Sequence, residues 1–215
     1  MQILEIINPT IKQGNYSGVF RDSNRNHDKD PGFLGSGNFS VVSQDRSDPH
    51  MVTKTARGTK ETEIDGFWIY SQYILKYKLW ENPYFPRIYA KKTFTDKTRK
   101  SINRAQIEKL TPPSDLNDSE IAFLYRKMFG EEVDPKKTNH NVHTLSTRVE
   151  EEVVSKSFKN KDKYDSSYVR AVTILHKIAG KHDLIIDIWG DNIMIRRGPH
   201  GVQLVITDPF SSSAK

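Results

Sequence analysis

Residues 187–208, DIWGDNIMIRRGPHGVQLVITD, are the stretch that decides the predicted fold. Two apolar segments, 193–195 and 204–206, stand on either side of a turn-forming GPHG sequence, a pattern typical of a β-hairpin. Asp187 stands five residues before Asn192, and Asp208 follows the second apolar segment. The hairpin would therefore bring two carboxylates and an amide to its open end, where they can converge on one point.

These three side chains suit phosphoryl transfer, which depends on positioning and on neutralising phosphate charge. Mg²⁺ takes oxygen ligands and is often held by one or two carboxylates together with substrate phosphates, so Asn192 and Asp208 are candidate metal ligands. Asp187 is the candidate base for an acceptor hydroxyl. The alternative is an ordinary loop, because Asp and Asn also favour turns.

A second candidate part lies near the start of the chain, in GFLGSGNFSVVS at residues 32–43. This segment predicts a strand, a turn and a second strand. Gly35, Ser36 and Gly37 are the candidate cover for a nucleotide's phosphates, since backbone N–H groups approach an anion closely where no side chain intervenes. Phe39 would cap this turn. An ordinary hairpin is the alternative interpretation.

The strand that follows, HMVTKTA, carries Lys54 as the candidate phosphate-binding lysine. A lysine in that role needs a carboxylate to hold it, and the helix predicted next supplies candidates. We expect Glu63 to pair with Lys54, with Glu61 and Asp65 as alternatives. A lone lysine on a strand is otherwise a solvated surface residue.

The remaining pattern predicts an α+β chain of two lobes. Residues 1–30 form an N-terminal extension, residues 31–111 a strand-rich N-lobe with one helix, and residues 112–215 a reduced, mostly helical C-lobe. Within the C-lobe we expect a helix that stops at Gly130, a polar loop over 131–147, a charged helix over 148–158 and a helix that stops at Gly180. A loop would precede the hairpin, and a short tail would follow Asp208.

The composition excludes several classes of protein. The 215 residues contain no cysteine, which excludes disulfides and thiolate metal sites, and no stretch is apolar enough to cross a bilayer. The formal net charge of +6 indicates an anionic partner. Basic residues cluster at 91–104 and 156–163, either as solvated faces or as nucleic-acid contacts, although no basic motif with interleaved aromatic residues supports the second interpretation.

Taken together, these motifs resemble the protein-kinase fold over about residues 33–210. LGSGNFS, FPRIY, GDNIM and ITDPFS most closely resemble the early protein kinases of T-odd-type podovirus bacteriophages. The resemblance implies a Ser/Thr kinase that uses ATP and Mg²⁺, acts on host proteins, and works in the cytoplasm of the infected cell. It also implies that Glu108 and Leu110, in QIEKL, lie at the hinge against adenine.

The chain departs from the eukaryotic kinase pattern at several positions. Ile185 and Ile186 replace the His-Arg pair before the catalytic Asp, Asp208-Pro-Phe replaces Asp-Phe-Gly, and Ser40 stands where a third glycine is usual. Trp189 lies two residues after Asp187, which is similar to small-molecule kinases of the aminoglycoside and fructosamine type. Seven residues follow Asp208, so we expect either a very small C-lobe or a shortened chain. A small-molecule phosphotransferase and a non-catalytic, kinase-like inhibitor of a host factor are the alternatives.

Overall fold

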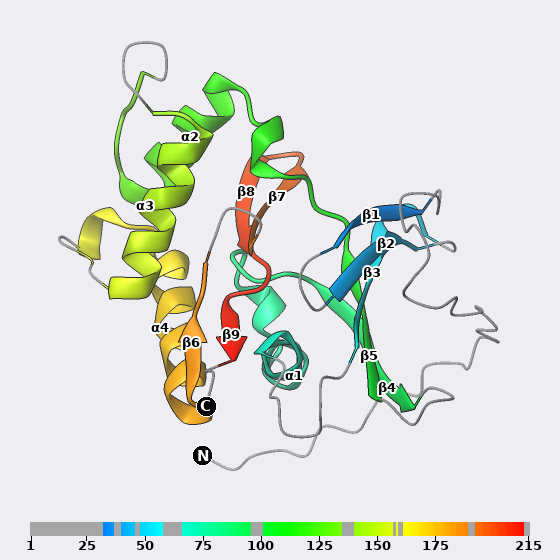
Figure 1. Ribbon diagram of the computed structural model, residues 1–215. Coiled ribbons are helices and arrows are strands. Elements are labelled where there is room, and N and C mark those ends of the chain that lie inside the picture. Colours follow the sequence, from blue (N-terminus) through cyan, green and yellow to red (C-terminus); the bar gives the residue numbers. More distant parts are fainter. Residues whose placement is uncertain are drawn as a thin grey trace.

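The computed structural model describes residues 32–36, 40–45, 48–57, 66–95, 101–134, 140–156, 158, 161–188 and 192–212. Over these residues the protein combines an antiparallel sheet with a group of helices, and the expected α+β class is confirmed. Figure 1 shows the sheet on one side of the molecule, helices α2, α3 and α4 on the other, and helix α1 with the β7–β8 hairpin between them.

The sheet has five strands: β1 (Phe33–Ser36), β2 (Ser40–Gln44), β3 (Met51–Arg57), β4 (Ile88–Thr95) and β5 (Ser101–Glu108). All neighbours are antiparallel, in the order β1-β2-β3-β5-β4. Helix α1 (Gly66–Tyr77) lies between β3 and β4 in the sequence, and β5 returns beside β3 while β4 takes the edge. The strands expected from the front half are confirmed.

Three helices follow: α2 (Asp118–Phe129), α3 (Val142–Ser155) and α4 (Ser166–His182). Two of the expected boundaries are wrong. Helix α3 begins inside the predicted loop because Asn141 and Thr144 form a capping box that starts the helix there. Helix α4 continues past Gly180, and the left-handed residue that ends it is Asp183, whose amide donates to the carbonyl of Ala179.

The last part of the chain forms β6 (Leu184–Ile186), β7 (Ile193–Gly198), β8 (Gly201–Ile206) and β9 (Phe210–Ser212). The predicted β7–β8 hairpin is confirmed. The expected loop before it and the tail after it are wrong, because β6 and β9 pair with each other in an antiparallel ladder. Each is three residues long, too short for hydrophobic periodicity to reveal.

Within the described residues, short 3₁₀ segments connect these elements: η2 (Leu79–Glu81), η3 (Pro113–Asp115) and η4 (Lys161–Lys163).

One hydrophobic core runs through the sheet, α1, the three other helices and the β7–β8 hairpin. Tyr70 and Ile74 of α1 are fully buried in this core, which also contains Ile107 of the sheet and Ile206 of the hairpin. Helix α1 thus fixes the sheet against the hairpin that carries the candidate site. In the described part of the chain, none of the helices has the length and apolar character needed to cross a membrane.

Candidate active site

Lys54 projects from the inner face of the sheet. Side chains alternate along a strand, so Lys54 shares a face with Val52 and Ala56, both of which are buried. Its ammonium lies 4.1 Å from the centre of the Phe67 ring of α1 and forms an ion pair with the carboxylate of Asp208. The two side chains are only 13% and 28% exposed. Two residues 154 positions apart in the sequence thereby meet.

The end of β8 is held in place from two directions immediately before Asp208. The amide of Ile206 donates to the carbonyl of Tyr84 at 2.9 Å, and its carbonyl accepts the Tyr70 hydroxyl at 2.7 Å. Burial, and secondarily the charge of Asp208, raises the pKa of Tyr70 well above its usual value. Tyr70 therefore stays protonated and remains a hydrogen-bond donor at any physiological pH.

Backbone hydrogen bonds join the other two predicted residues to the same place. The Asn192 side-chain amide donates to the carbonyl of Asp187 at 2.9 Å, and the Asn192 carbonyl accepts from the amide of Thr207 at 2.8 Å. The amide of Asp187 donates to the carbonyl of Pro209, also at 2.9 Å. Since Thr207 and Pro209 flank Asp208, the structure brings together Lys54, Asp187, Asn192 and Asp208.

The Asp187 carboxylate differs from that of Asp208 in its partners. Its backbone is hydrogen-bonded on both sides, yet no hydrogen bond or ion pair engages its carboxylate within the described residues. An aspartate whose main chain is fixed and whose side chain has no partner can accept a proton from a bound hydroxyl without first breaking a hydrogen bond.

The oxygen atoms at this site fit a magnesium ion. Because the amide nitrogen of Asn192 donates to the carbonyl of Asp187, its side-chain oxygen remains as an acceptor. Asp208 supplies a carboxylate directly after Thr207, whose amide is bonded to the Asn192 carbonyl. Hard oxygen ligands of this kind, with substrate phosphates completing the set, are typical of Mg²⁺. No group of three or more His, Cys, Asp or Glu residues suited to a metal occurs in the part of the chain that the structure describes, so the ligands of a zinc-like site are lacking there.

The segment from Glu108 to Thr111 connects the sheet to the helical part. The Glu108 carboxylate does not project outward: it is bonded to the Arg196 guanidinium of β7 and accepts the Arg87 amide at 2.8 Å. Its side chain therefore fixes this segment in place. At Leu110, by contrast, neither the backbone amide nor the carbonyl has a hydrogen-bond partner among the described residues. Thr111 then pairs with Ile195 of β7.

Several predicted residues are described only in part or not at all. Gly35 and Ser36 end β1 and pair with Val42 and Val41 of β2, after a register shift at the start of the strand, and only their backbone is described. The remaining candidates lie outside the described residues: Gly37, Phe39, Glu61, Glu63, Asp65 and Trp189. The expected pairing of Lys54 with Glu63 stays a prediction.

The sequence did not reveal the residues that support the site. Tyr70 and Thr207 act on backbone carbonyls, and Pro209 contributes a carbonyl of its own. Backbone acceptors carry no sequence signal. Phe67 could have been found from the sequence, because an aromatic residue at the start of the helix that follows a strand lysine is a candidate for a cation–π contact with that lysine.

Comparison with models of known protein families and with curated proteins finds no match for this chain. The functional interpretation therefore depends on the residues and their geometry.

Proposed function

We propose that this protein is an ATP-dependent phosphotransferase of the protein-kinase type, with serine or threonine hydroxyls of proteins as acceptors. The observation that carries the proposal is the meeting of Lys54 and Asp208 in a partly buried ion pair, with Asn192 and Asp187 hydrogen-bonded beside them. A lysine on the third strand, an aspartate and an asparagine for Mg²⁺, and a catalytic aspartate are the parts that protein kinases use.

The arrangement of strands and helices supports the same proposal. A five-stranded antiparallel sheet in the order β1-β2-β3-β5-β4 has one helix inserted after β3, and a short connection leads from β5 to the helices. Asp187 and Asn192 lie between β6 and β7, and Asp208 lies between β8 and β9. This order of elements is compatible with the two-lobed kinase plan that the sequence motifs resemble, and Lys54 meets Asp208 where the sheet faces the end of the β7–β8 hairpin.

In this proposal each residue has a separate task. Lys54 moves from Asp208 to the phosphates and neutralises their charge, and the Asp208 carboxylate holds a metal ion. Asn192 supplies an oxygen while its amide keeps the Asp187 main chain in place. Asp187 accepts the proton of the acceptor hydroxyl. Bound Mg²⁺ would supply charge neutralisation on the phosphates. The unpaired backbone groups of Leu110 are suited to an adenine edge.

The test is transfer of labelled γ-phosphate from ATP by the purified protein to a bacterial lysate, to casein, and to a panel of aminoglycosides and sugars. We expect label in the protein fraction and at least about a thousandfold loss with Asp187→Asn, Asp208→Asn and Lys54→Met, since electrostatic groups at a reacting centre typically contribute on this scale. Asp162→Asn and Lys92→Met, at exposed positions in η4 and β4, are the matched controls and retain activity.

Other outcomes would contradict the proposal in different ways. Label confined to the small-molecule fraction would identify a small-molecule phosphotransferase. Nucleotide binding without transfer to any acceptor, unchanged by Asp187→Asn, would point to a non-catalytic binding protein. Full activity in a folded Asp208→Asn variant would disprove the assigned metal site.

A further inference from the structure

The acidic residues of the helices are unevenly distributed. Helices α2 and α3 contain five of them, Asp118, Glu120, Glu150, Glu151 and Glu152. Helices α1 and α4, with 12 and 17 residues, contain none. A chain with 27 Asp and Glu residues in 215 therefore leaves two whole helices free of negative side chains.

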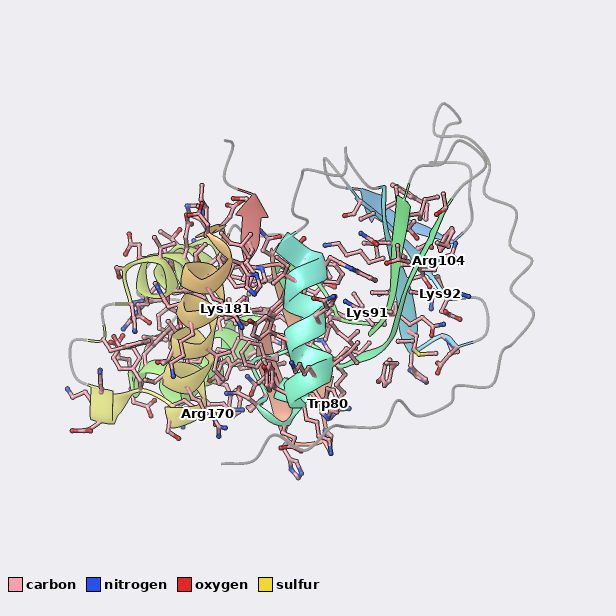
Figure 2. All side chains as sticks on the ribbon, turned by 90° about the horizontal axis from the view of Figure 1, so that it is seen from below. Trp80, Lys91, Lys92, Arg104, Arg170 and Lys181 are labelled. Atoms are coloured by element: carbon pink, nitrogen blue, oxygen red, sulfur yellow. The ribbon has the colours of Figure 1, made fainter. Side chains whose placement is uncertain are left out.

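These two helices run in opposite directions and are joined by the β6–β9 ladder, since β6 packs on α4 and β9 packs on α1. Long side chains also reach from one helix to the other. Near the end of α4, the Tyr73 hydroxyl of α1 lies 2.9 Å from Nε2 of His182. Near its start, the Asn82 side chain, just beyond α1, donates to the carbonyl of Ser167 at 2.8 Å. The exposed sides of α1 and α4 consequently form one surface, which we call the α1–α4 face, and Figure 2 looks onto it.

Basic side chains line the α4 half of this face. Arg170, Lys177 and Lys181 are all exposed and are separated by seven and four residues, which places them on one side of the helix. Over these eleven residues the stripe is roughly 16 Å long, at about 1.5 Å per residue. Figure 2 labels Arg170 and Lys181 along α4. Among the described residues, carboxylates flank the two helices beyond their ends: Glu81 follows α1, and Asp165 and Asp183 lie immediately before and after α4.

Aromatic rings alternate with cations on the α1 half. Tyr73 and Tyr77 have ring centres 5.5 Å apart, and Tyr77 is 52% exposed. The ammonium of Lys181 lies 5.7 Å from the Tyr73 ring, and that of Lys76 lies 5.3 Å from the Tyr77 ring. The series continues toward the sheet, where the Lys91 ammonium lies 3.7 Å from the Trp68 ring. A row of exposed cations beside an exposed aromatic ring is the combination that single-stranded nucleic acids bind.

We infer that the α1–α4 face binds single-stranded nucleic acid, with the basic stripe of α4 on the phosphates and Tyr77 stacked against a base. The site is separate from the candidate active site, and it does not depend on the proposed phosphotransfer. A nucleic-acid partner for this face is consistent with the net charge of +6. The sequence alone does not reveal the face, because its residues come from two helices separated by about ninety positions. An acidic polypeptide would use the same cations but would gain little from the exposed ring.

The experiment measures fluorescence anisotropy of labelled 20-nucleotide single-stranded RNA and DNA, and of the matching duplex, between 50 and 200 mM salt. Both single strands should bind, and more tightly than the duplex. The variant Arg170→Glu/Lys177→Glu/Lys181→Glu should bind at least about tenfold more weakly, with the slope of log affinity against log salt reduced by about 2, because each phosphate contact contributes about 0.7.

A second triple variant distinguishes an effect of this face from an effect of the net charge. Arg126→Glu/Lys161→Glu/Lys163→Glu changes exposed residues of α2 and η4 and lowers the formal charge from +6 to zero, as the first variant does. It should bind like the wild type. Tyr77→Ala should weaken binding several-fold without changing the salt slope, since it removes stacking and no charge. Circular dichroism confirms that each variant is folded.

Three results would overturn the inference. Equal weakening by the two triple variants would mean that net charge alone attracts the oligonucleotides. Displacement of RNA by poly-glutamate at the same charge concentration, together with no effect of Tyr77→Ala, would identify a surface for acidic polypeptides. Absence of binding at 50 mM salt, or tighter binding of the duplex, would also disprove it. None of these outcomes bears on phosphotransfer, which the active-site variants test separately.

Discussion

At the scale of single residues, a comparison of two buried tyrosines measures how much one hydrogen bond contributes to the free energy of unfolding. Tyr70 and Tyr168 are both fully buried, but Tyr70 donates to the carbonyl of Ile206, whereas the Tyr168 hydroxyl has no hydrogen-bond partner in the described part of the chain. We expect Tyr70→Phe to lower the free energy of unfolding by about 1–2 kcal/mol, since it leaves a buried carbonyl unsatisfied. Tyr168→Phe should either raise the free energy of unfolding or lower it by less than about 0.5 kcal/mol, because no hydrogen bond is lost. Urea denaturation compares the two, and equal losses would show that the Tyr168 hydroxyl is satisfied in solution.

Single residues also show which parts of the candidate active site can be predicted from the sequence. Lys54, Asp187, Asn192 and Asp208 were identifiable because each is a polar residue at the end or on the apolar face of a predicted strand. Their convergence was a hypothesis that the structure bears out geometrically. The ion pair by which Glu108 fixes the segment after β5 to Arg196 was beyond the sequence, because nothing in a local pattern pairs residues 88 positions apart.

At the scale of elements, two glycines have opposite surroundings. A Cβ on Gly66, at the start of α1, would lie 2.6 Å from the Phe210 carbonyl oxygen of β9, whereas a Cβ on Gly180 of α4 meets nothing within 4 Å. Gly66→Ala should therefore cost about 1–3 kcal/mol by forcing α1 away from β9. Gly180→Ala should stabilise by about 0.5–1 kcal/mol, because alanine favours a helix interior. Thermal unfolding of both variants is the measurement, and a neutral Gly66→Ala would contradict the close packing of α1 on β9.

The junction of α2 and α3 predicts how stability depends on pH. The Arg148 guanidinium donates two hydrogen bonds to the Glu131 carboxylate, of 2.5 and 2.9 Å. These bonds hold the pKa of Glu131 below its usual value. Its stabilisation is therefore present above the unfolded pKa, near 4.5, and is lost as the pH falls through the lower folded pKa. Glu131→Gln should lower the free energy of unfolding by about 1 kcal/mol at pH 7, because a partly exposed ion pair such as Arg148–Glu131 contributes little more than that. The difference from wild type should shrink below pH 4.5. A difference that stays constant down to pH 3 would mean that the carboxylate charge contributes nothing.

Element types followed from the sequence more reliably than element ends. The apolar rhythm of α1, α2 and α4 and the glycine hairpin gave the right kind of structure, since periodicity over ten or more residues is a strong signal. The start of α3 was missed because a capping box at Asn141 outweighs the polar composition of the residues after it. The β6–β9 ladder was missed because each of its strands is only three residues long and its partner lies more than twenty positions away, so no local pattern reveals it.

At the scale of the whole molecule, a buried ion pair joins the sheet to the β7–β8 hairpin. Arg196 bonds to Glu108 and also donates to the carbonyls of Pro83 and Phe85, and the side chains of the pair are 17% and 8% exposed. Its neighbour Arg197 pairs with Glu120 at the surface, where its side chain is 43% exposed. The two adjacent arginines therefore provide a buried pair and an exposed control.

We expect Arg196→Met to lower the free energy of unfolding by about 3 kcal/mol, because it leaves the Glu108 carboxylate buried without its cation. Arg197→Met should cost less than about 1 kcal/mol. The double variant Glu108→Leu/Arg196→Met should lose at least about 1.5 kcal/mol less than the sum of its single variants, since the second change removes the stranded charge. Urea denaturation gives all four values. Additive losses would mean that the two side chains stabilise the protein independently and that their ion pair does not hold the sheet to the hairpin.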